Sequence, residues 1–94
     1  MICARLAWSN ADKTAERAIH LEGHKQFLRS GALDVLQSGP LFDANGVQVG
    51  ALIVAEVADI ETMCAVCAED PFAIYDIYDR ITFLEWRITT GRSF

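Results

Sequence analysis

The segment VQVGALIVAEV (47–57) restricts the possible folds more than any other part of the chain. It is rich in β-branched residues and almost continuously apolar, which is typical of a strand buried on both faces. Gly50 interrupts the run, and a glycine inside a strand marks a bulge or the close approach of another group. We therefore expect 47–57 to lie at the centre of a sheet.

The remaining segments alternate between strand and helix patterns. Strands are predicted at 2–8, at 32–42 with a break at Gly39-Pro40, and at 80–88; a turn is predicted at 43–46, and helices at 12–30, 60–68 and 70–75. We expect Asp12, Asp59 and Asp70 to cap the three helices, since each precedes a helical pattern. The order β-α-β-β-α-(short α)-β predicts an α+β fold with a ferredoxin-like split βαβ sheet.

Composition suggests that part of the surface is covered by a second copy of the chain. Apolar residues make up 52% of only 94 residues. A small monomer cannot bury that much apolar surface. Helices would cover one face of the predicted sheet and leave the other bare. We therefore expect a homodimer or a higher homo-oligomer.

Charge and cysteine content exclude several classes of partner. The net charge is −5, and the basic residues are scattered rather than clustered. Nucleic-acid binding requires a basic stripe, and an anionic membrane surface is disfavoured for the same reason. No run approaches the roughly 18 apolar residues of a membrane-spanning helix. With three cysteines and no secretory signal, we expect a cytoplasmic protein with free thiols.

Two histidines on the first predicted helix are the main candidates for chemistry. His20 and His24 are four residues apart and would point to the same side of a helix. His20 is a candidate general base or acid, with a plain surface histidine as the alternative. A zinc site needs at least one more ligand, which Glu16 or Glu22 could supply, but this histidine spacing alone is a weak signal and lacks the HExxH form, so we predict no metal. Cys64 and Cys67 come late in a helix, which favours packed thiols over a redox pair.

Asp70 has two possible roles. Aspartate before proline is an ordinary helix cap, but a carboxylate can also fix the tautomer of a histidine and stabilise its charged form. Further residues near these segments are candidates for substrate binding. They are Asp12, Arg17, Phe72 and Tyr75. No nucleotide-binding, flavin or EF-hand motif is present, so no organic cofactor is predicted.

Three segments, taken in order, resemble the YCII-related (YciI-like) family. They are RAIHL (17–21), SGPLFDANGVQVGALIVAE (38–56) and EDPFAIYDIYDRITFLEWR (69–87). The resemblance implies a single YCII-related domain over 1–94 that dimerises through its sheets into a dimeric α+β barrel. It also implies a His–Asp site, which maps onto His20 and Asp70 and leaves His24 outside the motif. Where the family often has a serine after the strand glycine, this chain has Ala51.

The best established activity within that family is the dehydrochlorination of a chlorinated hydroxyhydroquinone. The resemblance therefore implies a small lyase without a cofactor that acts on an aromatic substrate. His20, oriented by Asp70, would take a proton from a substrate hydroxyl, and the ring would tautomerise and expel chloride. Two alternatives remain: a non-catalytic module that binds a small molecule, and an isomerase or monooxygenase acting on aromatics.

Overall fold

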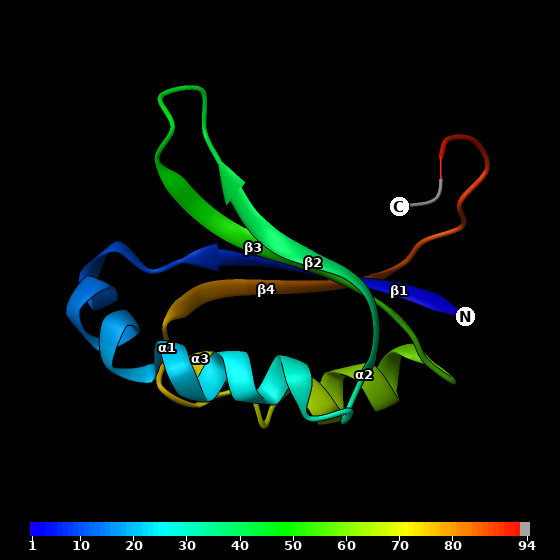
Figure 1. Cartoon of the computed structure of the whole chain (residues 1–94), viewed down its shortest axis with the longest axis horizontal. Helices are drawn as coiled ribbons and strands as arrows, with labels where there is room; N and C mark the ends of the chain where they lie inside the picture. Colours follow the sequence, from blue (N-terminus) through cyan, green and yellow to red (C-terminus); the bar gives the residue numbers. More distant parts are fainter. Residues whose placement is uncertain (93–94) are drawn as a thin grey trace.

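Four strands form one antiparallel sheet in the order β2-β3-β1-β4, and the helices lie against one of its faces (Figure 1). The computed structural model describes residues 1–92. In chain order the elements are β1 (Ile2–Ser9), the short 3-10 helix η1 (Ala11–Lys13), α1 (Thr14–Arg29), β2 (Asp34–Phe42), β3 (Gln48–Glu56), α2 (Ile60–Cys67), α3 (Pro71–Ile74) and β4 (Tyr78–Glu85). This order and strand arrangement confirm the predicted ferredoxin-like α+β fold.

The predicted central strand is β3, which pairs with β1 on one side and β2 on the other. Three consecutive residues, 53–55, are buried, so both faces of β3 are covered at that end. Gly50 marks a close approach, as predicted. A Cβ atom placed there would lie 2.2 Å from the carbonyl oxygen of Ala7 on β1. Glycine therefore allows β1 and β3 to pair at this point.

The core lies between the sheet and the helices. Cys3 of β1 packs with Met63 and Cys67 of α2, and Ala7 of β1 packs with Phe72 of α3. Side chains alternate along a strand, so Arg5 must point into the same layer as Cys3 and Ala7. Its side chain is fully buried. The strand 2–8 thus carries a charged residue into the core.

The helix ends agree in part with the sequence predictions. Asp59 caps α2 by accepting a hydrogen bond from the backbone N–H of Thr62 at 2.7 Å, and Asp70 caps α3. The prediction that Asp12 caps the first helix is wrong. Asn10 accepts a hydrogen bond from the Asp12 N–H and begins η1, and α1 follows with no side-chain cap.

The predicted break in the second strand is also wrong, because β2 continues through Gly39-Pro40 to Phe42. Proline lacks an N–H donor and is tolerated on an edge strand, and β2 is an edge. The irregularity takes the form of register shifts between Val35 and Gln37 and between Leu41 and Phe42.

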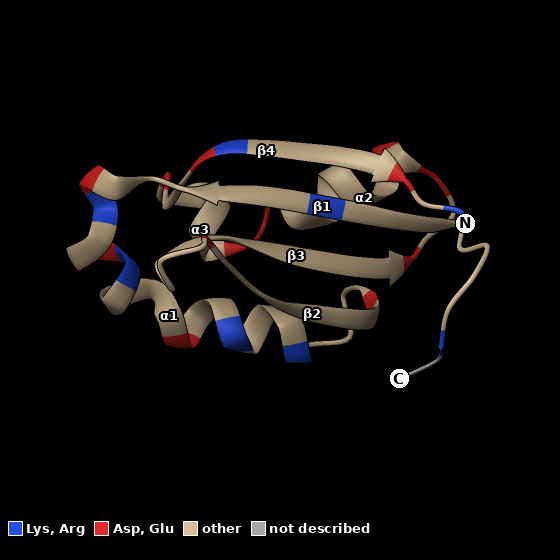
Figure 2. Cartoon of the chain, turned by 90° about the horizontal axis from the view of Figure 1, so that it is seen from above, with Lys and Arg blue, Asp and Glu red and all other residues tan. Residues whose placement is uncertain are grey.

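The other face of the sheet has no helix over it within residues 1–92 (Figures 1 and 2). Leu6 of β1 lies opposite Leu52 of β3 on this face, and Leu84 of β4 is 52% exposed beside them. Residues 86–92, which follow β4, and the β2–β3 hairpin both extend to this side of the sheet (Figure 1). None of the described helices is long and apolar enough to cross a membrane.

Candidate functional site

The candidate site is organised around Asp70, which caps α3 and is fully buried. Its Oδ2 accepts a hydrogen bond from Nη1 of Arg5 at 2.9 Å. Its Oδ1 accepts the backbone N–H of Phe72 at 2.9 Å and lies 2.9 Å from Nδ1 of His24. A buried carboxylate is stable only when it is paired and hydrogen-bonded, and these three donors satisfy that requirement.

The contact with Asp70 determines the tautomer of His24. An ionised carboxylate accepts hydrogen bonds only, so Nδ1 carries the proton and Nε2 of the neutral ring has a free lone pair. Nε2 makes no hydrogen bond within residues 1–92. Arg5 Nε is the one fully buried side-chain nitrogen or oxygen there without a partner, so His24 Nε2 retains contact with solvent. His24 can therefore accept a proton at Nε2.

Aromatic contacts close the cluster into a ring. The imidazole of His24 stacks on Phe72 with 4.1 Å between centroids, and Phe72 meets Tyr78 edge to face at 5.6 Å. The guanidinium of Arg5 lies 5.2 Å from the centroid of the Tyr78 ring and forms the ion pair with Asp70, which completes the ring of contacts. Each member is held by two neighbours, which limits the rotation of His24.

The environment keeps Asp70 ionised. Burial by itself would raise the pKa of the Asp70 carboxyl, but hydrogen bonds from His24 and Arg5 outweigh it and lower the pKa. Burial raises the pKa of the Tyr78 hydroxyl, although the charge of Arg5 opposes this. Asp70 is therefore an anion beside His24, and Tyr78 is a neutral phenol beside Arg5.

A close contact between α1 and α3 brings His24 to Asp70. A Cβ atom at Gly23 would lie 3.2 Å from Cγ of Pro71, which follows Asp70. Glycine at 23 thus lets the start of α3 approach α1 closely. The next residue along α1, His24, then reaches the carboxylate that caps α3.

The predicted pairing of His20 with Asp70 is not what the structure shows, because His24 takes that position. His20 stacks instead on Tyr75 with 3.8 Å between ring centroids, at the other end of α3. His24, which the resemblance left outside the motif, is only 8% exposed and lines the cavity described below. The two histidines do not form a pair.

Helical spacing contained a signal for His24. It belongs with Arg17, Leu21 and Leu28 to a stripe at intervals of four, three and four residues, which is the inward face of a helix. His20 lies at the edge of that stripe. Arg5, which the sequence analysis did not select, also had a signal, because a charge inside an apolar strand is rarely buried without a partner.

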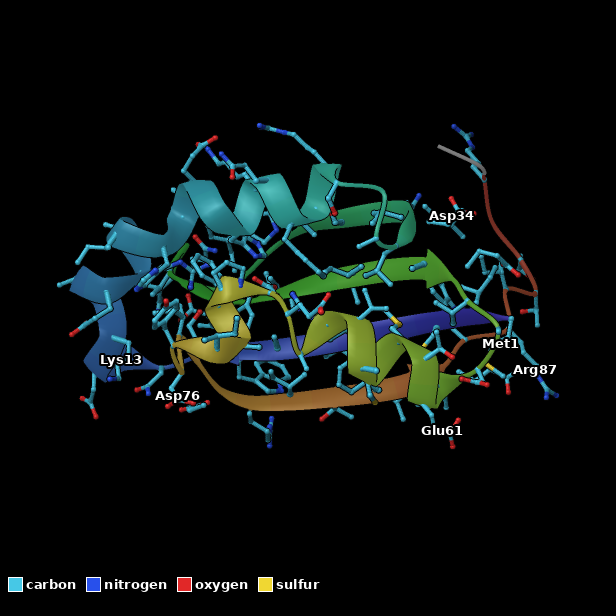
Figure 3. All side chains as sticks on the ribbon, turned by 90° about the horizontal axis from the view of Figure 1, so that it is seen from below. Met1, Lys13, Asp34, Glu61, Asp76 and Arg87 are labelled. Atoms are coloured by element: carbon cyan, nitrogen blue, oxygen red, sulfur yellow. The ribbon has the colours of Figure 1, made fainter. Side chains whose placement is uncertain are left out.

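A cavity of about 260 Å³ lies between α1 and the strands β2 and β3. Residues of both layers line it, some of them through their backbone: Arg5, Arg17, Leu21, His24, Lys25, Leu28, Ser38, Gly39, Pro40, Gln48, Ala51, Leu52, Ile53 and Phe72. Side chains of α1 and α3 point toward the sheet around this region (Figure 3). The wall is apolar apart from the basic residues, His24, Ser38 and Gln48, which suits a small aromatic ligand.

The predicted substrate-binding residues divide into two groups. Arg17 and Phe72 line the cavity, whereas Asp12 and Tyr75 do not. Asp12 is exposed on η1, and Tyr75 is half-exposed beside His20. Ala51 lies on the cavity wall and offers a methyl group there.

None of the three cysteines lines the cavity. Burial raises the pKa of the Cys67 thiol to about 11, which agrees with the prediction of a packed thiol. Cys64 is partly buried on the same helix. Residues 1–92 contain no cluster of three or more His, Cys, Asp and Glu side chains suited to a metal ion.

Comparison with known proteins shows similarity in fold. No protein-family model matches the sequence, and no curated protein matches it. The 5-chloro-2-hydroxyhydroquinone dehydrochlorinase from Burkholderia phenoliruptrix AC1100, solved with 2,5-dihydroxybenzoquinone, is similar with a TM-score of 0.80 and 15% identity over 93% of this chain and 94% of that one. A protein from Arabidopsis thaliana is similar with a TM-score of 0.52 and 11% identity, over 97% of each chain. At these identities the likeness shows the fold, a small ferredoxin-like α+β domain.

Proposed function

We propose that this chain is a lyase that needs no cofactor and uses His24, oriented by Asp70, as its general base. The observation that carries the proposal is the Nδ1 contact of His24 with the buried Asp70 carboxylate, which leaves Nε2 free on a residue that lines the cavity. This is the arrangement by which a carboxylate fixes a catalytic histidine. The fold of the dehydrochlorinase supports the choice of substrate, a chlorinated hydroxyhydroquinone.

The proposed reaction removes one molecule of hydrogen chloride and needs no oxidant or reductant. His24 Nε2 takes the proton from a ring hydroxyl and leaves a phenolate, and the ring carbon that bears chlorine then takes this proton from the imidazolium to give the keto tautomer. His24 Nε2 next takes the proton of a second hydroxyl, the electron pair of that O–H bond forms a second carbonyl, and the C–Cl bond breaks with its electron pair leaving on chloride. The imidazolium finally passes its proton to solvent. The product is a hydroxyquinone. A positioned base of this kind contributes about 10²–10⁴-fold to the rate.

The residues next to His24 and Asp70 are placed to support this role. The hydrogen bond from Arg5 helps to keep Asp70 ionised, and the ionised carboxylate can stabilise the imidazolium that forms when His24 is protonated. Phe72 stacks on the imidazole and also lines the cavity, which orients the ring toward a ligand. His20 lies outside this arrangement and is not assigned a role in the reaction.

The proposal includes a homodimer that forms through the open face of the sheet. This face contains apolar side chains of neighbouring strands, among them Leu6, Leu52 and the half-exposed Leu84. A monomer rarely leaves such a surface in water. Sedimentation velocity of the wild-type chain and of Leu84→Lys checks this part, because the charge would shift a dimer of this kind toward monomer.

Chloride release from 5-chloro-2-hydroxyhydroquinone tests the proposed reaction. We expect wild type to release chloride and His24→Gln to be slower by about 10²–10⁴-fold. His20→Gln is the matched control on the same helix, and we expect it to stay within a few-fold of wild type. Full activity in His24→Gln would overturn the assignment of the base.

Two other outcomes point to the alternative functions. A wild-type chain that binds 2,5-dihydroxybenzoquinone but releases no chloride would be a binding module rather than a lyase. Consumption of dioxygen with an aromatic substrate would indicate a monooxygenase. Both measurements use the same purified protein.

A further inference from the structure

The charges around the cavity are unbalanced in one direction. Three basic residues line it, Arg5, Arg17 and Lys25, and no aspartate or glutamate does. Arg5 is neutralised by Asp70. Within residues 1–92, neither Arg17 nor Lys25 has a carboxylate within ion-pair distance. The chain as a whole has a net charge of −5, so this excess of positive charge is local.

Arg17 is held next to the proposed base. Its Nη1 donates a hydrogen bond to Oγ of Ser9 at 2.9 Å, and its guanidinium lies 5.1 Å from the centroid of Phe72. Phe72 is the ring on which His24 stacks. The cation is thus fixed at the same aromatic side chain as the base, while most of its N–H donors are unused. A guanidinium with free donors beside a cavity suits an oxygen anion.

We propose that the cavity binds its aromatic ligand as an anion, with a ring oxygen or carboxylate oxygen on Arg17 and with Lys25 adding positive charge on the α1 side. The ligand class is therefore hydroxylated rings that ionise, including hydroxyquinones, which are acidic because they are vinylogous carboxylic acids. This inference rests on the proposed function only in taking the cavity as the ligand site.

The same charge has a consequence for the reaction. When His24 removes a proton from a ring hydroxyl, negative charge remains on that oxygen. Arg17 lies where it can stabilise this oxyanion and the anionic product, as preorganised cations do in other active sites. His24 becomes a cation when it takes the proton, so a second positive charge then lies near the negative charge on the ring. Arg17 is therefore assigned to binding and to oxyanion stabilisation.

Matched pairs of ligands test the inference by calorimetric binding. The first pair is 2,5-dihydroxy-1,4-benzoquinone, an anion at neutral pH, and its neutral 2,5-dimethoxy analogue. The second pair is 2,5-dihydroxybenzoate and 2,5-dihydroxybenzamide. We expect the wild type to prefer the anion in at least one pair, with an affinity that falls as salt concentration rises.

Variants of residues on α1 test whether the preference for the anion depends on Arg17. We expect Arg17→Gln to lower the affinity for the anion by about 10–100-fold, the range for a hydrogen bond to a charged group, and to leave the neutral analogue unchanged. Arg17→Lys should recover part of the loss because it keeps the charge. Arg29→Gln removes an exposed arginine of the same helix outside the cavity and should bind like wild type. Circular dichroism verifies that each variant is folded.

The inference is overturned if the wild type binds both members of each pair equally, if it binds none of the four, or if a folded Arg17→Gln keeps the anion preference. These results are separate from the chloride assay. Chloride release without an anion preference would retain the proposed lyase and reject the role of Arg17. An anion preference without chloride release would reject the lyase and retain the anion site.

Discussion

Replacing Asp70 by asparagine should strongly destabilise the chain. The substitution preserves size and still allows the side-chain oxygen to accept the Phe72 N–H. It removes the charge opposite Arg5, and both side chains of that pair are fully buried at an N–O distance of 2.9 Å. The new amide group must also face Arg5 or the Nδ1–H of His24, and both of these are donors.

The expected magnitude follows from the isolated charge of Arg5. Removal of one partner from a buried ion pair lowers the free energy of unfolding by about 3–5 kcal/mol. The free energy of unfolding of a small domain is only about 5–15 kcal/mol, so this loss is a large fraction of the stability of the chain. For a domain of this length it corresponds to a fall in Tm on the order of 20 °C.

Urea unfolding followed by tryptophan fluorescence measures the effect at one fixed protein concentration, and the chain has two tryptophans as probes. Asp59→Asn is the matched control, because Asp59 caps α2 at the surface and asparagine caps a helix about as well as aspartate. The double variant Arg5→Met/Asp70→Asn removes both charges. Its loss in free energy of unfolding should be smaller than the sum of the losses of the two single variants. Equal stability of Asp70→Asn and Asp59→Asn, or strict additivity in the double variant, would refute the reasoning.

Three further predictions concern packing, thiol chemistry and pH. Gly50→Ala should lower the free energy of unfolding by about 1–3 kcal/mol or more, because its Cβ would lie 2.2 Å from a backbone oxygen. Gly39→Ala is the control and should leave the free energy of unfolding nearly unchanged, because there is open space around Gly39. Equal losses for the two variants in urea titrations would contradict the close-contact argument. Burial raises the pKa of the Cys67 thiol to about 11, so this thiol should resist iodoacetamide at pH 8 in the folded chain and react once the chain is unfolded in urea. Mass spectrometry measures the labelling. Rapid labelling of Cys67 in the folded chain would contradict the prediction, because it would show that the thiol is accessible. Asp70 has a folded pKa below its ordinary value of 3.8, so its contribution to stability is complete above that pH and is lost as the pH falls through the folded pKa. Wild type should therefore lose more stability than Asp70→Asn in acid titrations below about pH 3.8, and parallel curves would exclude this role.

Local patterns in the sequence were sufficient to predict the elements and their order. The apolar run at 47–57 predicted the central strand, and Gly50 within it predicted the close approach of β1. The Asp70-Pro71 pair predicted a capped helix start, which is where α3 begins. These features depend on a few consecutive residues, so neighbouring chemistry is enough to identify them.

The identity of the histidine at the site was decided only by the tertiary structure. Both histidines lie on one side of α1, and the rise between them is about 6 Å, close to one helical turn. The choice between them depends on how far α3 is displaced along α1, and Gly23 permits Pro71 to lie close to α1 at this point. Asp70 consequently meets His24, and Tyr75 meets His20.

The sequence by itself determined the fold class, the central strand and the carboxylate that begins α3, because each is specified by local periodicity and capping. The tertiary structure alone decided that Arg5 and His24 share this carboxylate and that Arg17 and Lys25 meet on one cavity wall. The physical reason is that these contacts join strand β1, helix α1 and helix α3, which are far apart along the chain. Their distances depend on packing between layers, and no local pattern contains that information.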